Sequence, residues 1–288
     1  MKDWWDQRPV FSTTDKGGRI TGLAPGESPG QVTPRLVTSA AVCFGAWGAA
    51  SSLGTSWLCN ASSAPAETCA VDLPSGVPVI WRVVATVVVA YLLLTLTLNF
   101  GEQARQRLGQ RRAASLVRAT AVLAGIAAGA GFSVVTGFAP DRAGTLQRTL
   151  DGRIGTEAYA LSAALTLIAA VWWVTVVGRL PSALVHAQQR QATIERLRRD
   201  GRRYAGTVRL GGIVFWLGNS PELNVTIAYD SPAGTHELAA RMRTSPDRVP
   251  ADGSRVLVFD DLRGVVHVEL DLDAAPTFEP EARCTPAE

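Results

Sequence analysis

Two cysteines in one short polar stretch have the clearest chemistry in this chain. Cys59 and Cys69 flank CNASSAPAETC, which contains no histidine and no bulky side chain. Paired thiolates form a disulfide or bind zinc, but a zinc site needs further ligands at suitable spacing, and this stretch offers none. A bridge closing so short a loop is worth somewhat under about 3 kcal/mol. We therefore predict a Cys59–Cys69 disulfide, which requires an oxidising compartment.

The other titratable residues do not form a familiar catalytic pattern. His186, His236 and His267 lack HExxH spacing, and the chain has neither a GxSxG nucleophile elbow nor a glycine loop in the strand-to-helix context that cradles phosphate. Four aspartates could bind a metal or act as acid and base, namely Asp260, Asp261, Asp271 and Asp273. Aspartate at strand ends more commonly supports a turn. We therefore expect a non-enzymatic protein without a cofactor or metal.

The elements that would carry these residues are dominated by four apolar stretches. They run from Leu36 to Leu58, Val79 to Phe100, Ala119 to Ala139 and Ala158 to Gly178, and about twenty residues are enough to span a bilayer as a helix. The second and fourth lack the polar stripe that a soluble amphipathic helix needs. Buried helices of a soluble core are the alternative, mainly for the first stretch. The sequence predicts a transmembrane α-helical domain over 36–180 after a polar cytoplasmic tail over 1–35.

Basic residues predict the orientation, because short cytoplasmic flanks are enriched in Lys and Arg. The loop over 60–78 has no basic residue, whereas the N-terminal tail, the loop after the second span and the segment after the fourth span have several each. Both termini are therefore expected in the cytoplasm, and the cysteine loop outside it. All but two of the 28 basic residues are Arg, which is typical of a GC-rich bacterial genome, so we expect a bacterial plasma membrane protein.

Few residues within the spans suggest function. Arg82 follows Trp81 near the exported end of the second span, where its side chain can reach the interface as an anchor. Substrate binding is the alternative for Arg82. Gly125 and Gly129 have the GxxxG spacing that lets two helices approach closely. We favour packing within one bundle, with homo-oligomerisation through the same face as the alternative.

After the fourth span the sequence predicts a juxtamembrane helix over 181–203. Ser182 is suited to begin this helix, and Gly201 to end it. The basic run over 196–203 adjoins the membrane and is not interleaved with aromatic residues. Lipid headgroups or solvent are therefore its expected surroundings, and nucleic acid is not an expected partner.

From Tyr204 the apolar residues alternate with a period of two in about six short segments. This pattern predicts a small β-barrel over 204–274, followed by a flexible tail over 275–288. One face of the strand ELNVTIAYD should be buried through Leu223, Val225, Ile227 and Tyr229. The fold class is thus four transmembrane helices plus a small all-β, barrel-like cytoplasmic domain.

Three motifs of this C-terminal part resemble a known family. RRDGRRYAGTV over 198–208, a strand ending at Asp230 before a turn at Gly234, and GSRVLVFD over 253–260 are similar to the bacterial domain of unknown function family 3592. In this chain Phe259 stands where the family has Tyr, and no Pro follows Asp260. The resemblance implies a membrane-associated protein with a small β fold, and no particular reaction or ligand.

The expected function is that of a membrane anchor with a cytoplasmic β-domain for protein interaction or sensing. Its expected partners are the lipid bilayer and an unidentified protein. Phe215 and Trp216 are neighbours in the apolar segment IVFWL and should point to opposite faces, which makes them a candidate partner surface. A small transporter or channel component is the first alternative, and a membrane-bound enzyme with an unrecognised site is the second.

Overall fold

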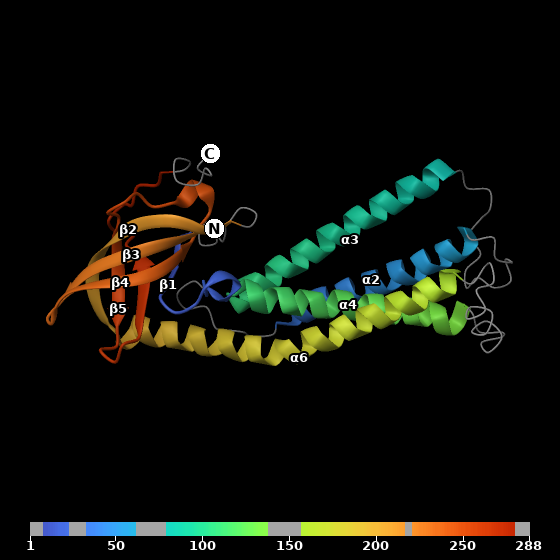
Figure 1. Cartoon of the computed structure of the whole chain (residues 1–288), viewed down its shortest axis with the longest axis horizontal. Coiled ribbons are helices and arrows are strands. Elements are labelled where there is room, and N and C mark those ends of the chain that lie inside the picture. The colour runs from blue at the N-terminus through green and yellow to red at the C-terminus, as the bar shows by residue number, and fades with distance from the viewer. Residues whose placement is uncertain (1–7, 23–32, 62–78, 138–156, 217–220, 280–288) are drawn as a thin grey trace. The chain divides into compact units, whose positions relative to one another are not determined.

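The computed structural model describes residues 8–22, 33–61, 79–137, 157–216 and 221–279. The chain divides into two compact units. The helical unit consists of Val32–Arg105 and Ala114–Ala183, and the β unit of Met1–Gln31, Gln106–Ala113 and Leu184–Glu288. Figure 1 shows the elements of both units, coloured from blue at the N-terminus to red at the C-terminus.

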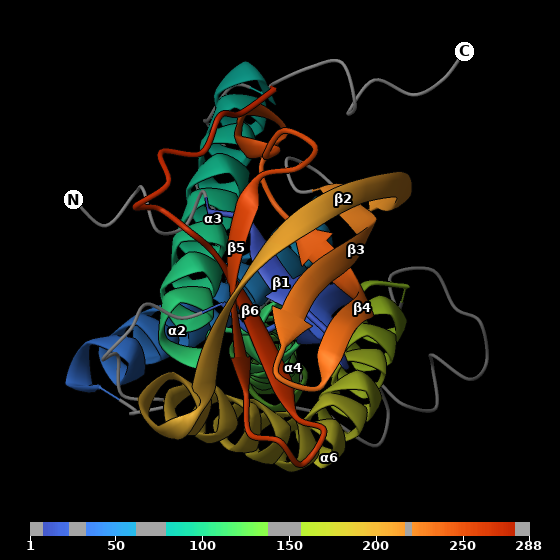
Figure 2. The ribbon, with the colours of Figure 1, turned by 90° about the vertical axis from the view of Figure 1, so that its left-hand side faces the viewer.

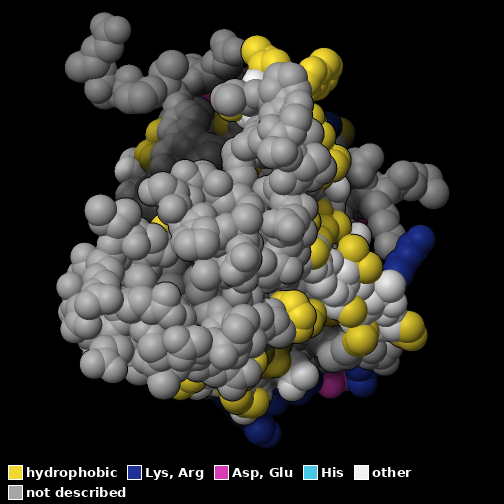
Figure 3. Space-filling view, turned by 90° about the vertical axis from the view of Figure 1, so that its right-hand side faces the viewer, with side chains coloured by type: hydrophobic (Ala, Val, Ile, Leu, Met, Phe, Trp, Pro, Cys, Tyr) yellow, Lys and Arg dark blue, Asp and Glu magenta, His cyan; other side chains and the backbone are white. Residues whose placement is uncertain are grey.

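Four long helices confirm the predicted membrane domain. They are α2 (Pro34–Ala61), α3 (Val79–Leu108), α4 (Arg111–Gly137) and α6 (Glu157–Asp200), and all four are long and apolar enough to cross a membrane. Val87 and Leu92 of α3 are among many large apolar side chains that are exposed, which suits a hydrocarbon surrounding. Figure 3 shows such side chains across much of the described surface in that view. The chain therefore has the helices of a multi-pass membrane protein.

Small residues bring α2 and α4 together inside the helical unit. A Cβ added to Gly125 would lie 2.5 Å from the backbone oxygen of Phe44, and one added to Gly129 would clash with the backbone of Gly48. The hydroxyls of Ser52 and Ser133 are hydrogen-bonded across the same two helices at 3.0 Å. The GxxxG glycines thus lie in a contact within the chain, as expected for close helix packing.

The predicted start of the juxtamembrane helix is wrong, because α6 continues from Glu157 to Asp200 with Pro181 inside it. The Ser182 hydroxyl donates to the carbonyl of Arg179 at 3.0 Å instead of beginning a new helix. An interior proline removes one backbone donor and usually kinks or breaks a helix, but α6 continues on both sides of Pro181. The predicted end is confirmed, since Gly201 N–H donates to the Leu197 carbonyl at 2.9 Å.

The β unit contains a six-stranded antiparallel sheet that is nearly closed into a barrel (Figure 2). Its strands are β1 (Val10–Ser12), β2 (Arg202–Trp216), β3 (Pro221–Ser231), β4 (Gly234–Arg243), β5 (Arg255–Asp260) and β6 (Val266–Leu270). The order is β1-β4-β3-β2-β5-β6. The Thr13 hydroxyl, directly after β1, donates to the Val266 carbonyl of β6 at 3.1 Å. This contact links the two ends of the sheet and supports the predicted barrel-like domain.

Three features of the β unit differ from the predictions. Two expected segments form the single strand β2, whose pairing with β3 shifts register between Leu210 and Ile213 and again before Phe215. The sixth strand comes instead from the N-terminal residues expected to be a tail, and Phe11 of β1 is only 2% exposed. Part of the expected C-terminal tail is also attached, since Pro250 pairs with Phe278. The predicted buried face of β3 is confirmed, because Leu223, Val225, Ile227 and Tyr229 are all buried.

Candidate functional site

One face of α6 carries three polar side chains that contact carboxylates of the β unit. His186, Arg190, Ile194 and Arg198 follow one another at intervals of four residues, which places them on the same side of a helix. The three polar members each contact a carboxylate from a distant part of the chain. We call these four residues the polar face of α6.

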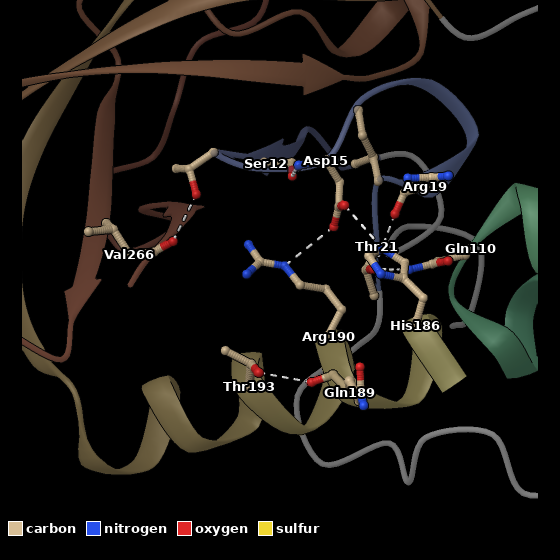
Figure 4. Close-up of polar contacts among 12 residues, drawn as sticks. Ser12, Asp15, Arg19, Thr21, Gln110, His186, Gln189, Arg190, Thr193 and Val266 are labelled. Atoms are coloured by element: carbon tan, nitrogen blue, oxygen red, sulfur yellow. Dashed lines mark hydrogen bonds and ion pairs between the residues drawn. The ribbon is translucent and has the colours of Figure 1, made fainter. Parts of the chain in front are cut away.

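Asp15 lies beside His186 and Arg190, the two N-terminal polar residues of this face (Figure 4). Its Oδ1 atom is 3.0 Å from Nε2 of His186, and its Oδ2 atom is 3.6 Å from Nε of Arg190. The Asp15 backbone N–H also donates to the Ser12 hydroxyl at 2.9 Å. Because an ionised carboxylate only accepts hydrogen bonds, we assign the proton between Asp15 and His186 to Nε2. The cluster attaches the N-terminal segment to α6 three residues after β1 ends.

The turn between α3 and α4 belongs to the same unit and is bonded to both of these segments. The Gln110 side-chain amide donates to the Thr21 hydroxyl at 2.7 Å. The Gln191 amide, on α6, donates to the carbonyl of Leu108 at 2.8 Å. Both glutamines are almost fully buried, so these bonds replace lost contacts with water. Three separate segments of the chain thus meet in one polar network.

A second cluster joins Arg198, at the C-terminal end of the polar face of α6, to β6. The Arg198 guanidinium donates from Nε to Oε1 of Glu269 at 2.6 Å and from Nη1 to Oε1 of Glu195 at 2.5 Å. His267 contacts the same Glu269 oxygen through Nε2 at 2.8 Å. The side chain of Arg198 is only 13% exposed and that of His267 only 6%. These polar side chains are therefore held largely out of water and depend on one another for hydrogen bonds.

The environment separates the pKa values of Glu269 and His267. Burial raises the pKa of the Glu269 carboxyl, but the hydrogen bond and charge of His267, together with Arg198, outweigh it and lower the pKa to about 2. Burial is the main cause that lowers the pKa of His267, against the opposing effect of Glu269. At neutral pH the cluster therefore contains an ionised carboxylate and a neutral imidazole.

A small cavity of about 40 Å³ lies beside this second cluster. Its lining combines polar side chains with apolar ones and includes Arg8, Phe11, Thr21, Ile194, Arg198 and Glu269. This volume holds a few water molecules, whereas sites for small organic ligands usually measure about 300 Å³ or more. The cavity is suited to hydrating the buried charges.

Asp260 and Asp261, two of the four aspartates considered for chemistry, support turns in the structure. Asp260 accepts the backbone N–H of Leu262 at 2.7 Å, and one oxygen of Asp261 accepts the N–H groups of Arg263 and Val265 at 2.9 and 3.1 Å. Within the described ranges of the chain, no group of three or more His, Cys, Asp or Glu is arranged to hold a metal ion. The turn interpretation therefore accounts for these residues.

Several predicted site residues lie wholly or partly outside the described part of the chain. Cys69 lies outside the described residues, and so do the side chains of Cys59, Arg82, Phe215 and Trp216. The described part of Phe215 and Trp216 is their backbone, which pairs with Glu222 and Pro221 of β3.

The predicted basic run is only partly available to lipid or solvent. Arg198 is engaged by Glu269, and Arg196 lies 3.4 Å from Asp261. The sequence did not reveal these pairs because their members are far apart in the chain. The four-residue spacing from His186 to Arg198 was the signal that could have indicated a functional helix face.

Comparison with protein families, curated proteins and solved structures found no match to this chain. The resemblance of residues 198–260 to family 3592 therefore stays a prediction.

Proposed function

We propose that this protein is a non-enzymatic membrane protein whose β-domain lies in the cytoplasm and binds a protein partner. The β-domain would sense the binding of that partner or a change at the inner membrane surface. The proposed location is the plasma membrane, with both termini inside, as the distribution of basic residues suggests.

One observation carries this proposal: the β unit is assembled from three segments separated by the apolar helices. The N-terminal segment through Asp15 and Thr21, the α3–α4 turn through Gln110, and α6 through His186 are joined by hydrogen bonds. If all four helices cross the bilayer, these segments must lie on one side of it. The titratable groups of this network bond to one another, which supports a role in assembly and interaction more than in catalysis.

Cysteine labelling of intact cells tests the shared location. Lys16→Cys, Arg107→Cys and Glu237→Cys each place one thiol at an exposed position of a different segment, in a chain whose native cysteines are replaced by serine. We expect all three to react with a membrane-impermeant maleimide only after permeabilisation. Ser63→Cys, in the loop expected outside, should react without it. Labelling of any of the first three in intact cells would overturn the proposed cytoplasmic side.

Photo-crosslinking in membranes tests the interaction. A photoreactive residue at Val214, which is 45% exposed on β2, should give a discrete protein adduct. The same group at Val88 of α3, which is 50% exposed on an apolar helix, serves as the matched control and should react mainly with lipid. Absence of an adduct at Val214 and at Glu237 of β4 would contradict the interaction role.

A further inference from the structure

We infer that residues 8–22 form a removable strap, and that the slot they fill between β4 and β6 is the docking site for an extended strand of a protein partner. This inference rests on the proposed interaction role and assigns to it one binding site. The N-terminal strap would then be the competitor that keeps the slot closed until a partner replaces it.

The backbone of the slot is suited to strand addition. β1 pairs with β4 over three residues, in the register Val10 with Arg243, Phe11 with Met242 and Ser12 with Arg241. On its other side, the Thr13 hydroxyl reaches the Val266 carbonyl of β6. The remaining strands form the continuous order β4-β3-β2-β5-β6 without β1. Removal of the strap would therefore leave a connected sheet with two open edges, which is the geometry that accepts an added strand.

The side-chain sites of the slot specify what the added strand must carry. Phe11 is 2% exposed and belongs to the same apolar cluster as Met242, Val249 and Leu270. Four residues later Asp15 meets His186 and Arg190 of the polar face of α6. A fitting partner strand therefore has a large apolar side chain followed, four residues on, by a carboxylate. Charge complementarity selects this carboxylate, since Arg190 would otherwise be left buried without it.

The strap is held at separate points, which include the short β1–β4 ladder, the Gly22 N–H bond to the Gly109 carbonyl at 2.9 Å and the buried side chains of Phe11 and Ile20. Gly17 N–H donates to Oε2 of Glu222 at 2.9 Å, and the Ile20 carbonyl accepts from Arg243 at 3.4 Å. A strand of three residues contributes little ladder by itself, whereas β3 and β4 pair over ten positions. Loss of the Asp15 contact should therefore loosen the part of the strap that contains β1, while the longer β3–β4 ladder keeps the rest of the sheet together.

A peptide competition on the full-length protein in lipid nanodiscs tests this inference. The chain has its native cysteines replaced by serine and carries Ser12→Cys, and the probe is a fluorescent peptide with the sequence of residues 8–22, RPVFSTTDKGGRITG. In the Asp15→Asn background we expect the thiol introduced at position 12 to react with a thiol reagent about 100-fold faster, as opening of a buried ion pair predicts, and the peptide to bind. Asp273→Asn, which removes one charge from an exposed side chain, should leave both readouts unchanged.

Two further variants test the strap independently of Asp15→Asn. A disulfide between Ser12→Cys and Arg241→Cys, which face each other in register, should lock the strap and abolish peptide binding. Thr13→Val removes the contact with Val266 and should release the strap even if Asp15→Asn fails to fold. A peptide with Phe11→Ser or Asp15→Asn should not bind.

The inference is overturned if the released strap leaves a slot that does not bind the peptide, if the locked protein binds it equally well, or if neither Asp15→Asn nor Thr13→Val accelerates labelling. None of these results would affect crosslinking at Val214, which tests the interaction role through another surface. Failure of the slot and failure of the proposed function are thus separable.

Discussion

Replacing Glu269 by glutamine tests the energetic role of the charge cluster on the polar face of α6. The folded protein lowers the pKa of this carboxyl from 4.5 to about 2, because His267 and Arg198 together outweigh the effect of burial. A lowered pKa means that the folded state favours the ionised form. The resulting stabilisation is complete above pH 4.5 and is lost as the pH falls through about 2.

The magnitude follows from the same shift. The difference between 4.5 and about 2 is 2.5 units, which corresponds to about 3 kcal/mol at about 1.4 kcal/mol per unit. Burial keeps His267 neutral near pH 7, so its charge contributes only at lower pH, and glutamine retains an oxygen that accepts from Arg198. We therefore expect Glu269→Gln to lower the stability of the β unit by about 2 kcal/mol at pH 7.

Native-state hydrogen exchange of the β6 amides, Val266–Leu270, measures this loss without assuming that both units unfold together. The difference between wild type and Glu269→Gln should not shrink between pH 7 and about 5, and it should shrink towards pH 3. Glu237→Gln, an exposed position on β4, controls for the change in net charge. A difference below about 0.5 kcal/mol at pH 7, or one that stays undiminished at pH 3, would refute the assigned role of Glu269.

Three further predictions follow from particular contacts. Burial lowers the pKa of His267 from 6.5, so stability should fall below pH 6.5 by up to about 1.4 kcal/mol per pH unit, and His267→Asn should flatten this slope in the same exchange experiment. Arg198→Ala should cost about 3 kcal/mol and Arg196→Ala under about 1 kcal/mol in that assay, because their side chains are 13% and 56% exposed; equal losses would contradict the pairing. Gly129→Ala should destabilise the helical unit in detergent by about 1 to 3 kcal/mol, whereas Gly178→Ala, with no atom within 4 Å of the added Cβ, should not; thermal unfolding of both variants decides this.

Local sequence patterns determined the secondary structure of most of this chain. Long apolar stretches without a polar stripe are sufficient to predict four membrane-spanning helices, because a bilayer requires that length and composition. Alternation in ELNVTIAYD likewise predicted the buried face of β3, since side chains in a strand alternate between two faces. The GxxxG spacing predicted a helix contact, because small residues permit close approach whatever the partner helix is.

Tertiary structure decided which distant segments come together. β1 has only three residues, which is too short for a periodic signal, and it becomes a strand because β4 and β6 offer it partners. Asp15 and His186 are separated by 171 positions in the sequence, and no local pattern reports such a pair. Pro181 suggested a break in the helix, but α6 continues through this residue. The sequence by itself thus determined the elements, whereas the assembly of the N-terminal strap, the α3–α4 turn and α6 into one charged network depended on packing between segments far apart in the chain.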